Sequence, residues 1–166
     1  MQGQMKGQTL NEQTLQQYLY DHIPLSSAMQ IQVIRAQEEE VILAAPLAPN
    51  INHMETVFGG SASAVAILAA WSLLHVRLKS AAINSQLVIQ SNMIEYALPI
   101  KGRFTARSCL AEAADWPRFV RTLARKGRAR ISVIAVLEYE GRQVGKLQGE
   151  FVALAATEEA ATAACA

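Results

Sequence analysis

The spacing of apolar residues predicts both helices and strands along this chain of 166 residues. Thr9 begins a capping-box sequence and is the expected N-cap of a helix that ends near His22, because Pro24 disfavours helix at the residue before it. Helical spacing returns over residues 115–126, and Gly127 is the expected C-cap. Apolar and polar residues alternate, as they do in strands, over residues 29–33. Further strands are predicted over residues 40–45, 85–96, 103–112, 129–140 and 143–155.

One segment is apolar on almost every side. Residues 62–74 contain only two polar residues, Ser63 and Ser72. As a helix this run is about 20 Å long at ~1.5 Å per residue, whereas a membrane span needs roughly 20 residues. A helix that is apolar nearly all round must then be buried inside the protein. We therefore predict a buried helix over residues 60–77, and no membrane partner is expected.

The order of the predicted elements indicates the fold class. One helix and two strands come first, and the buried helix is followed by four more strands. Six strands can cover one apolar helix when their antiparallel sheet curls around it, which is the α+β architecture called the hotdog fold. An ordinary α+β sandwich with one helix layer is the alternative, and periodicity leaves both open. A single domain over residues 1–166 is expected, with residues 1–8 and 157–166 flexible.

Composition narrows the class of protein. Hydrophobic residues make up 51% of the chain and charged residues 17%, which excludes a disordered chain. The formal net charge of +1 gives no general attraction to nucleic acid or to a membrane surface. Cys109 and Cys165 are a poor disulfide framework, and the N-terminus lacks the apolar core of a signal peptide, so a cytoplasmic protein is expected. His22, His53 and His75 show no metal-ligand spacing, and no cofactor is expected.

The loop and helix start at residues 52–60 form the candidate site of chemistry. Gly59 and Gly60 open the buried helix and have no Cβ to block a ligand. Backbone N–H groups at a helix N-terminus are unpaired and favour negative charge, so they suit the oxyanion that forms when a thioester carbonyl is attacked. The alternative is that the two glycines only allow the helix to pack closely on the sheet. Glycine spacing leaves both interpretations open.

This segment resembles the loop of hotdog thioesterases of the phenylacetyl-CoA type, in which an Asn, a short stretch with Gly and Thr, and His-Gly-Gly precede the central helix. Asn52, Thr56, Gly59 and Gly60 fall on that pattern. The run over residues 49–61 is more similar still to the subgroup of thioesterase domains that sometimes occur fused to acetyltransferase domains. The resemblance covers nearly the whole chain. It implies a hotdog fold, thioesterase activity and a homodimer, or a dimer of dimers, with the site at the interface.

Two departures from the family pattern concern the chemistry. Phe58 stands where the phenylacetyl-CoA type has His, and Ile67 stands where it has the Asp or Glu that activates water or attacks the carbonyl. The nucleophile is therefore expected to be a water held by Asn52 and by a group of the second subunit, with Asn52 also suited to polarise the carbonyl. The expected catalytic groups are Asn52, Gly59 and Gly60. An Asn52→Ala variant is expected to stay folded, because a loop amide far from the core contributes little to stability.

Further residues are candidates for contact with the substrate. His53 is an alternative general base, with a loop histidine as the ordinary interpretation, and Glu55 stands where the family has a glycine. Six basic residues fall within residues 118–130, which contain no acid; they suit the phosphates of coenzyme A or an acidic carrier protein, with a solvated helix face as the alternative. The expected substrate-binding residues are His53, Thr56, Phe58, Ser61, Tyr96, Arg125, Lys126 and Arg128.

The leading hypothesis is an acyl-thioester hydrolase that acts on acyl-CoA or an acyl carrier protein. A non-catalytic module that binds acyl thioesters is the first alternative, because Ile67 replaces the usual acid. A hotdog dehydratase is the second alternative, and it lacks the helix carboxylate that this chemistry needs. Nucleic acid is not an expected partner, because no aromatic residues alternate with the basic ones at stacking distance.

Overall fold

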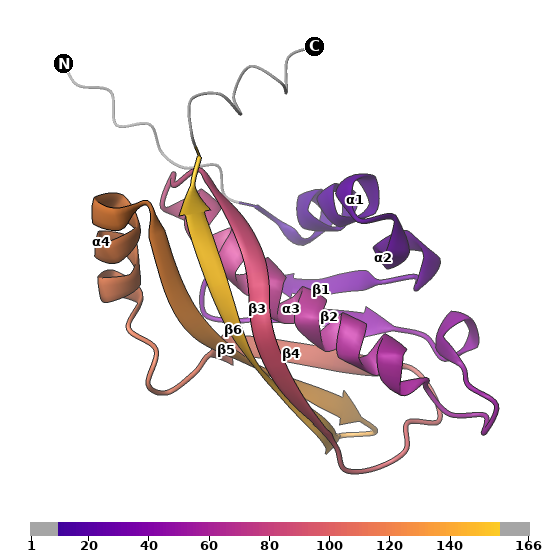
Figure 1. Ribbon diagram of the computed structural model, residues 1–166. Coiled ribbons are helices and arrows are strands. Elements are labelled where there is room, and N and C mark those ends of the chain that lie inside the picture. Colours follow the sequence, from indigo (N-terminus) through magenta and orange to yellow (C-terminus); the bar gives the residue numbers. More distant parts are fainter. Residues whose placement is uncertain (1–9, 157–166) are drawn as a thin grey trace.

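Residues 10–156 are described by the computed structural model, and they form one antiparallel sheet wrapped around a long helix (Figure 1). This is the hotdog fold that the sequence predicts. The elements in chain order are α1 (Glu12–His22), α2 (Pro24–Ala28), β1 (Gln32–Ala36), β2 (Val41–Ala45), the 3-10 helix η1 (Ala48–Asn50), α3 (Gly59–Ser80), β3 (Ser85–Tyr96), β4 (Phe104–Leu110), α4 (Trp116–Lys126), β5 (Arg128–Tyr139) and β6 (Arg142–Ala155).

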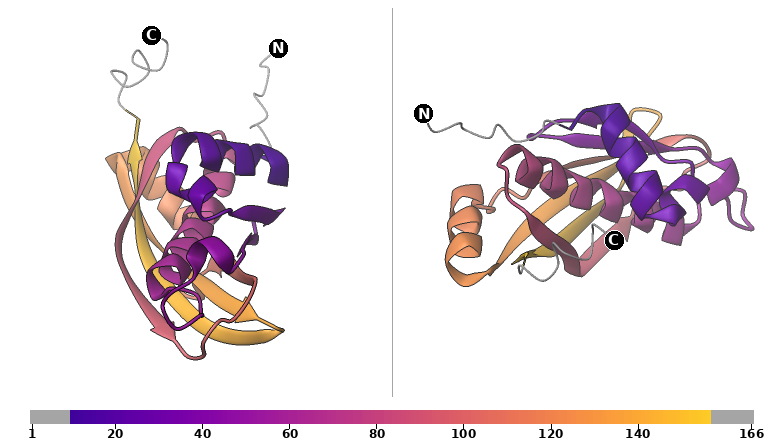
Figure 2. Two further views of the ribbon diagram at one scale, coloured as in Figure 1. Left: turned by 90° about the vertical axis from the view of Figure 1, so that its right-hand side faces the viewer. Right: turned by 90° about the horizontal axis from the view of Figure 1, so that it is seen from above.

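The six strands lie in the order β1-β2-β4-β5-β6-β3, and every neighbouring pair is antiparallel. Three of the pairs, β1–β2, β4–β5 and β5–β6, join strands that are consecutive along the chain. The pairing of β2 with β4 instead connects strands on either side of α3 in the sequence. Figure 2 shows the sheet curving around α3. The helix is therefore enclosed jointly by strands that precede it and strands that follow it.

The core is centred on α3 because this helix has apolar residues on nearly every side. Val65, Ala66, Ala69 and Leu73 have no exposed surface, and the alanines let the sheet approach closely. The Ser108 hydroxyl of β4 lies 2.8 Å from the Ala69 carbonyl, so a polar group of the sheet is satisfied by the helix. By length and composition α3 could cross a membrane, but 67% of its most apolar window is buried inside the protein. We therefore interpret α3 as the core helix.

The predicted elements agree with the structure in type and order, with two corrections near the N-terminus. Asn11 caps α1, accepting the Thr14 N–H at 2.8 Å and donating its own N–H to the Thr14 hydroxyl at 3.0 Å. The prediction that Thr9 is the cap is therefore wrong, and Thr9 itself lies outside the described residues. Met29 is the C-cap of α2 and not part of a strand, because Pro24 begins a second short helix instead of ending helical structure.

At α4 the predicted C-cap is confirmed. Gly127 adopts a left-handed φ of +66°, a conformation that glycine reaches at little cost. Asp115 precedes the helix as its N-cap and accepts the Arg118 N–H at 2.9 Å. Cys109 is exposed on β4, whereas Cys165 and the predicted flexible termini lie outside the described residues.

The two edges of the sheet differ in length and in exposure. The edge strand β1 has five residues and packs against α1. The other edge strand, β3, has twelve residues and is half-buried or exposed along its whole length. One side of β3 pairs with β6, from Ser85 opposite Ala155 to Tyr96 opposite Gly145. The other side has no strand paired to it within residues 10–156, and such an edge is a template for pairing with another chain.

Candidate active site at the start of the central helix

Asn50 anchors the loop that leads into α3. Its side chain is buried, and Nδ2 donates to the carbonyls of Met29 at 3.0 Å and Pro46 at 2.8 Å. Its backbone carbonyl accepts the Phe58 N–H at 2.7 Å, which fixes the point where the helix begins. Sequence reasoning did not single out Asn50, because a polar residue directly after Pro49 is ordinarily an exposed turn residue.

Asn52 organises the loop with its side-chain oxygen. Oδ1 accepts the Met54 N–H at 2.9 Å, the Thr56 N–H at 3.2 Å and the Thr56 hydroxyl at 3.2 Å. An atom that accepts backbone N–H groups must be the amide oxygen, so Nδ2 faces away from these donors. Nδ2 makes no hydrogen bond to another described residue and is available to a ligand. Asn52 is therefore suited to polarise a carbonyl, whereas its oxygen is already used and is poorly placed to orient water.

This geometry gives Asn52 a part in the stability of the loop that the sequence did not indicate. Alanine would remove the acceptor of three hydrogen bonds and would release the loop. Thr56, predicted as a substrate-binding residue, directs its hydroxyl to Asn52 in the same network. Glu55 adopts a φ of +59°, a left-handed conformation that favours glycine. The glycine that the family resemblance implies at this position therefore has a conformational reason.

The first turn of α3 presents backbone donors. No side chain within residues 10–156 caps this N-terminus, and the first intrahelical bond runs from the Ala62 N–H to the Phe58 carbonyl at 3.0 Å. The N–H groups of Gly59, Gly60 and Ser61 come before that bond, so they have no acceptor within the helix. Together with the helix dipole, these N–H groups create a positive potential that favours an oxyanion.

An apolar cavity of about 310 Å³ lies beside Gly59. The Tyr96 hydroxyl donates to the Gly59 carbonyl at 3.0 Å, which ties the end of β3 to the first residue of the helix. The Tyr96 ring lies 3.6 Å from the position where a side chain on Gly59 would begin, so a residue larger than alanine would press on the ring. The cavity is lined by Val57, Gly59, Tyr96, Ala97, Leu98, Pro99, Ile100 and Val144.

Phe58 lies over Gly60. A Cβ on Gly60 would sit 2.3 Å from the Phe58 ring, so the glycine admits the ring in this position. The sequence predicts that Gly60 leaves room for an acyl group, and in this chain the phenyl ring takes that room. Phe58 is 56% exposed and belongs to an exposed apolar rim around the helix start. The other members of this apolar rim are Ile51, Met54, Tyr96 and Leu98.

The other residues that the sequence singles out in this region lie in the loop or on α3. His53 is exposed in the loop, Ser61 is half-buried in the first helical turn, and Ile67 is half-buried further along α3. Residues 56–94 contain no Asp or Glu. Glu95 alternates with Tyr96 along β3 and therefore points to the opposite face of the sheet.

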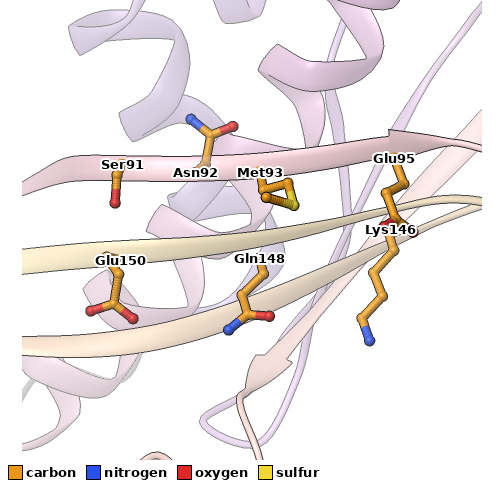
Figure 3. A pocket seen from close by; sticks show the side chains of 7 residues that line it. All are labelled: Ser91, Asn92, Met93, Glu95, Lys146, Gln148 and Glu150. Carbon is orange, nitrogen blue, oxygen red and sulfur yellow. The ribbon is translucent and has the colours of Figure 1, made fainter.

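A larger hollow, of about 490 Å³, lies over β3 and β6 (Figure 3). Side chains of both charges share it, and the Glu150 carboxylate is bonded to the Ser132 hydroxyl. None of the predicted site residues lines this hollow, so it is separate from the helix start. Its lining residues, all labelled in Figure 3, are Ser91, Asn92, Met93, Glu95, Lys146, Gln148 and Glu150.

The predicted basic residues lie at the other end of α3. Arg125 and Lys126 end α4, Arg128 begins β5, and all three are exposed. The start of α4 meets the last turn of α3, where the Arg77 guanidinium lies 4.5 Å from the centre of the Trp116 ring. The 22 residues of α3 correspond to a length of about 33 Å at ~1.5 Å per residue. The structure therefore does not bring the basic residues to the helix start of the same protomer (Figure 1).

Comparisons with known proteins agree with this fold. The sequence model of the family described as "Putative thioesterase (yiiD_Cterm)" matches residues 12–155. A solved structure of a protein of unknown function from Chlorobaculum tepidum TLS is 28% identical with a TM-score of 0.82, covering 89% of this chain and 99% of that one. A "putative thioesterase" from Shewanella oneidensis is 24% identical with a TM-score of 0.77, covering 86% and 96%. Thioesterase HI1161 from Haemophilus influenzae is 12% identical with a TM-score of 0.71, covering 92% of this chain and 96% of that one. The Shewanella and Haemophilus structures show the shared fold.

Proposed function

The chain belongs to this thioesterase family, and we propose that it hydrolyses acyl thioesters of coenzyme A or of an acyl carrier protein. Family membership supports thioester hydrolysis in general. One observation supports the more specific proposal: the uncapped N-terminus of α3 lies beside an apolar cavity and follows the loop that Asn52 holds together. In the proposal, backbone donors, a side-chain donor and room for an acyl group serve one substrate at this end of the helix.

In the proposed reaction a water molecule attacks the carbonyl carbon of the thioester, and the carbonyl oxygen becomes negatively charged. The N–H groups of Gly59 and Gly60 and the Nδ2 group of Asn52 donate to this oxygen. The carbon–sulfur bond then breaks, the thiolate leaves and takes up a proton, and a carboxylic acid remains. Fixed donors of this kind contribute roughly 10²–10³ each to the rate. The acyl group is proposed to occupy the cavity beside Tyr96.

Activation of the water is proposed to come from a polar group of a second copy, with His53 as the alternative within the same loop. The helix is not a source of this base, because residues 56–94 contain no carboxylate and Ile67 occupies the family's acid position. Neutral imidazole is a suitable base near pH 7. His53 is exposed and adjacent to Asn52, which is the reason for keeping it as the alternative.

The second copy is proposed to pair along β3. An unpaired edge of twelve residues is unusually long for a sheet that ends in solvent. Val88 and Met93 on this strand are 50% and 70% exposed, and the apolar rim around the helix start is also uncovered. Antiparallel pairing of β3 with the same strand of a second copy would continue the sheet and would cover both surfaces.

Such a dimer gives the basic residues a role at the site. Antiparallel pairing brings the Ser85 end of one β3 next to the Tyr96 end of the other. Within one protomer Leu154 lies between Gln86 and Arg128 in the sheet, so Arg128 is two strand spacings from β3, on the order of 10 Å. The partner's basic residues would then be closer to the helix start than those of the same protomer. Phosphates of coenzyme A, or the acidic surface of a carrier protein, would suit them.

Release of free thiol from a panel of acyl-CoA and acyl-carrier substrates tests the proposal. We expect turnover by the unmodified protein and a higher KM for acyl-CoA, with kcat nearly unchanged, when Arg125, Lys126 and Arg128 are replaced by Gln. The effect should shrink at high salt, because exposed charges are screened. Lys146→Gln, in the hollow over β3 and β6, is the matched control and should leave KM unchanged.

A non-catalytic binding module is the second candidate, and Ile67 is the observation that favours it. The same substrates distinguish the two functions when binding is measured by calorimetry alongside thiol release. Binding without thiol release would identify a module, whereas neither binding nor release would contradict both proposals.

A further inference from the structure

A second cavity lies where α1, the last half of α3 and the start of β3 meet. Its volume is about 330 Å³, close to the lower end of the ~300–1,000 Å³ range of small-molecule sites. Its lining includes Tyr18 from α1, Trp71, His75 and Lys79 from α3, and Ser85 and Leu87 from β3. None of these residues belongs to the helix start, so the inference below does not rest on the proposed hydrolase activity.

Stacked rings form one wall of this cavity. The Tyr18 ring lies 4.6 Å from the His75 ring, and the His75 ring lies 4.7 Å from the Trp71 ring, all nearly parallel. The Trp71 indole N–H donates to the Leu87 carbonyl at 3.0 Å, which holds the ring against the edge strand. A flat and fixed aromatic wall of this kind favours the apolar body of a ligand.

Two buried polar atoms accompany the rings. The Nε2 atom of His75 and the hydroxyl of Ser85 are buried and have no hydrogen-bond partner within residues 10–156. His75 as a whole is only 8% exposed. Buried polar groups in native proteins are nearly always hydrogen-bonded, so an unpartnered atom on each of these two lining residues points to a polar ligand group.

Charge at the cavity favours an anion. Lys79 is part of the lining, and no acidic side chain lines the cavity within the described residues. Burial lowers the pKa of His75 to about 4, with the charges of Lys79 and His22 as smaller causes. The imidazole is therefore neutral at pH 7, and in the tautomer with its proton on Nε2 it is a donor. A hydroxyl, an imidazole N–H and an ammonium group are donors that a carboxylate accepts.

We propose that this cavity binds a small monocarboxylate whose apolar or aromatic body lies against Trp71 and Tyr18. Its oxygens accept hydrogen bonds from the Ser85 hydroxyl and the His75 Nε2–H, and Lys79 balances its charge. Within one protomer, most of the length of α3 separates this carboxylate site from the helix start.

Tryptophan fluorescence gives a direct test, because the chain has two tryptophans and only Trp71 lines the cavity. In the full chain with Trp116→Phe, Trp71 is the single reporter. We expect a saturable change with octanoate and with 3-phenylpropanoate. Octanamide, of the same length but uncharged, should bind at least about tenfold more weakly, the change expected from losing a charge-assisted contact.

Variants locate the site. Lys79→Met, Ser85→Ala and His75→Leu should each weaken octanoate binding by roughly fivefold or more, whereas Lys146→Met should leave it unchanged. Lys79 is exposed and Ser85 half-buried, so these two variants keep the test valid if His75→Leu fails to fold. The proposal is overturned if neither carboxylate gives saturable binding, if octanamide binds as well as octanoate, or if Lys146→Met has the same effect as Lys79→Met.

Discussion

The two ends of α3 are built in opposite ways. At the C-terminal end side chains close the helix: Arg77 donates to the Glu38 carbonyl, the Ser80 hydroxyl bonds the Glu38 carboxylate, and the Arg77 guanidinium lies over Trp116. At the N-terminal end no side chain of residues 10–156 caps the helix, and its first residues are two glycines. The N-terminal end therefore presents backbone donors, and the C-terminal end presents side-chain donors.

The cavities at the two ends have similar volumes, about 310 and 330 Å³, but different chemistry. Backbone N–H groups at the helix start survive most substitutions, so we expect function there to depend on the loop that positions a ligand against them. At the other end each donor is a side chain, so single replacements should remove binding. Substitutions at the two ends should therefore affect activity and binding in different ways.

The largest effect is expected at Asn52. Asn52→Asp keeps the oxygen that holds the loop and removes the Nδ2 donor. We expect kcat for thioester hydrolysis to fall by about 10²–10³, equivalent to about 2.7–4 kcal/mol of transition-state stabilisation, with little change in urea stability. Asn52→Ala should lose both activity and loop stability. A folded Asn52→Asp protein with full activity would remove Asn52 from the mechanism and would shift attention to His53.

At the other end of the helix the expected effect is on stability and depends on pH. Burial first, then Lys79 and His22, lower the pKa of His75 to about 4 from 6.5. Between pH 6.5 and pH 4 the unfolded chain binds a proton that the folded chain does not, so stability is lost as the pH falls through this window. The full loss is about 3 kcal/mol at ~1.4 kcal/mol per pKa unit.

Urea denaturation across this pH range, with variants of His75 and His53, measures the effect. His75→Leu should flatten the pH profile between pH 6.5 and 4, whereas His53→Leu should not, because His53 is exposed in its loop. If the His75→Leu profile is as steep as that of the unmodified protein, another group is responsible for the pH dependence.

A smaller effect is expected where β3 meets the helix start. Tyr96→Phe removes the hydrogen bond to the Gly59 carbonyl, which contributes about 0.5–1.5 kcal/mol in typical cases. Because Tyr96 is 55% exposed, we expect a loss of stability at the lower end of that range, measured as a lower Tm, together with a modest fall in kcat. Unchanged Tm and unchanged kcat together would indicate that this bond does not position the glycine.

The smallest effect is expected at Glu55. Glu55→Gly relieves the left-handed φ of +59° and should raise the free energy of unfolding by up to about 1 kcal/mol. Gly127→Ala is the mirror control, because φ is +66° there and the change should destabilise by a similar amount. A Glu55→Gly variant less stable than the unmodified protein would contradict the strain argument.

Much of the fold was predictable because its strands and its apolar central helix are long. The strand predicted over residues 85–96 coincides with β3. The predicted bounds of the buried helix differ from the bounds of α3 by at most three residues at either end. The N-terminal cap was less predictable, because Thr9 with Glu12 and Asn11 with Thr14 offer two capping sequences two residues apart, and local sequence does not rank them.

The site was predictable in position more than in detail. Glycine spacing and the family resemblance located Asn52, Gly59 and Gly60, but the direction of the Asn52 amide follows from N–H groups that only the folded loop brings together. The cavity at Trp71 and His75 gave no comparable signal. Its walls include Tyr18 and Ser85, which are far apart in sequence and meet only through tertiary packing.

Because strands from both sides of α3 in the sequence enclose the helix, part of its surface stays exposed on the nascent chain during translation. The hydroxyl of Ser108 on β4 reaches the Val41 carbonyl on β2 across 67 residues of sequence. At translation rates of about 5–20 residues per second, β2 emerges roughly 3–13 s, and the complete α3 roughly 1–5 s, before the strand that pairs with β2. The nascent chain thus passes through a period in which an unpaired strand edge and the most apolar helix are accessible together. The duration of that period is set by the speed of translation, and slow codons between residues 80 and 104 would lengthen the interval in which aggregation competes with closure of the sheet.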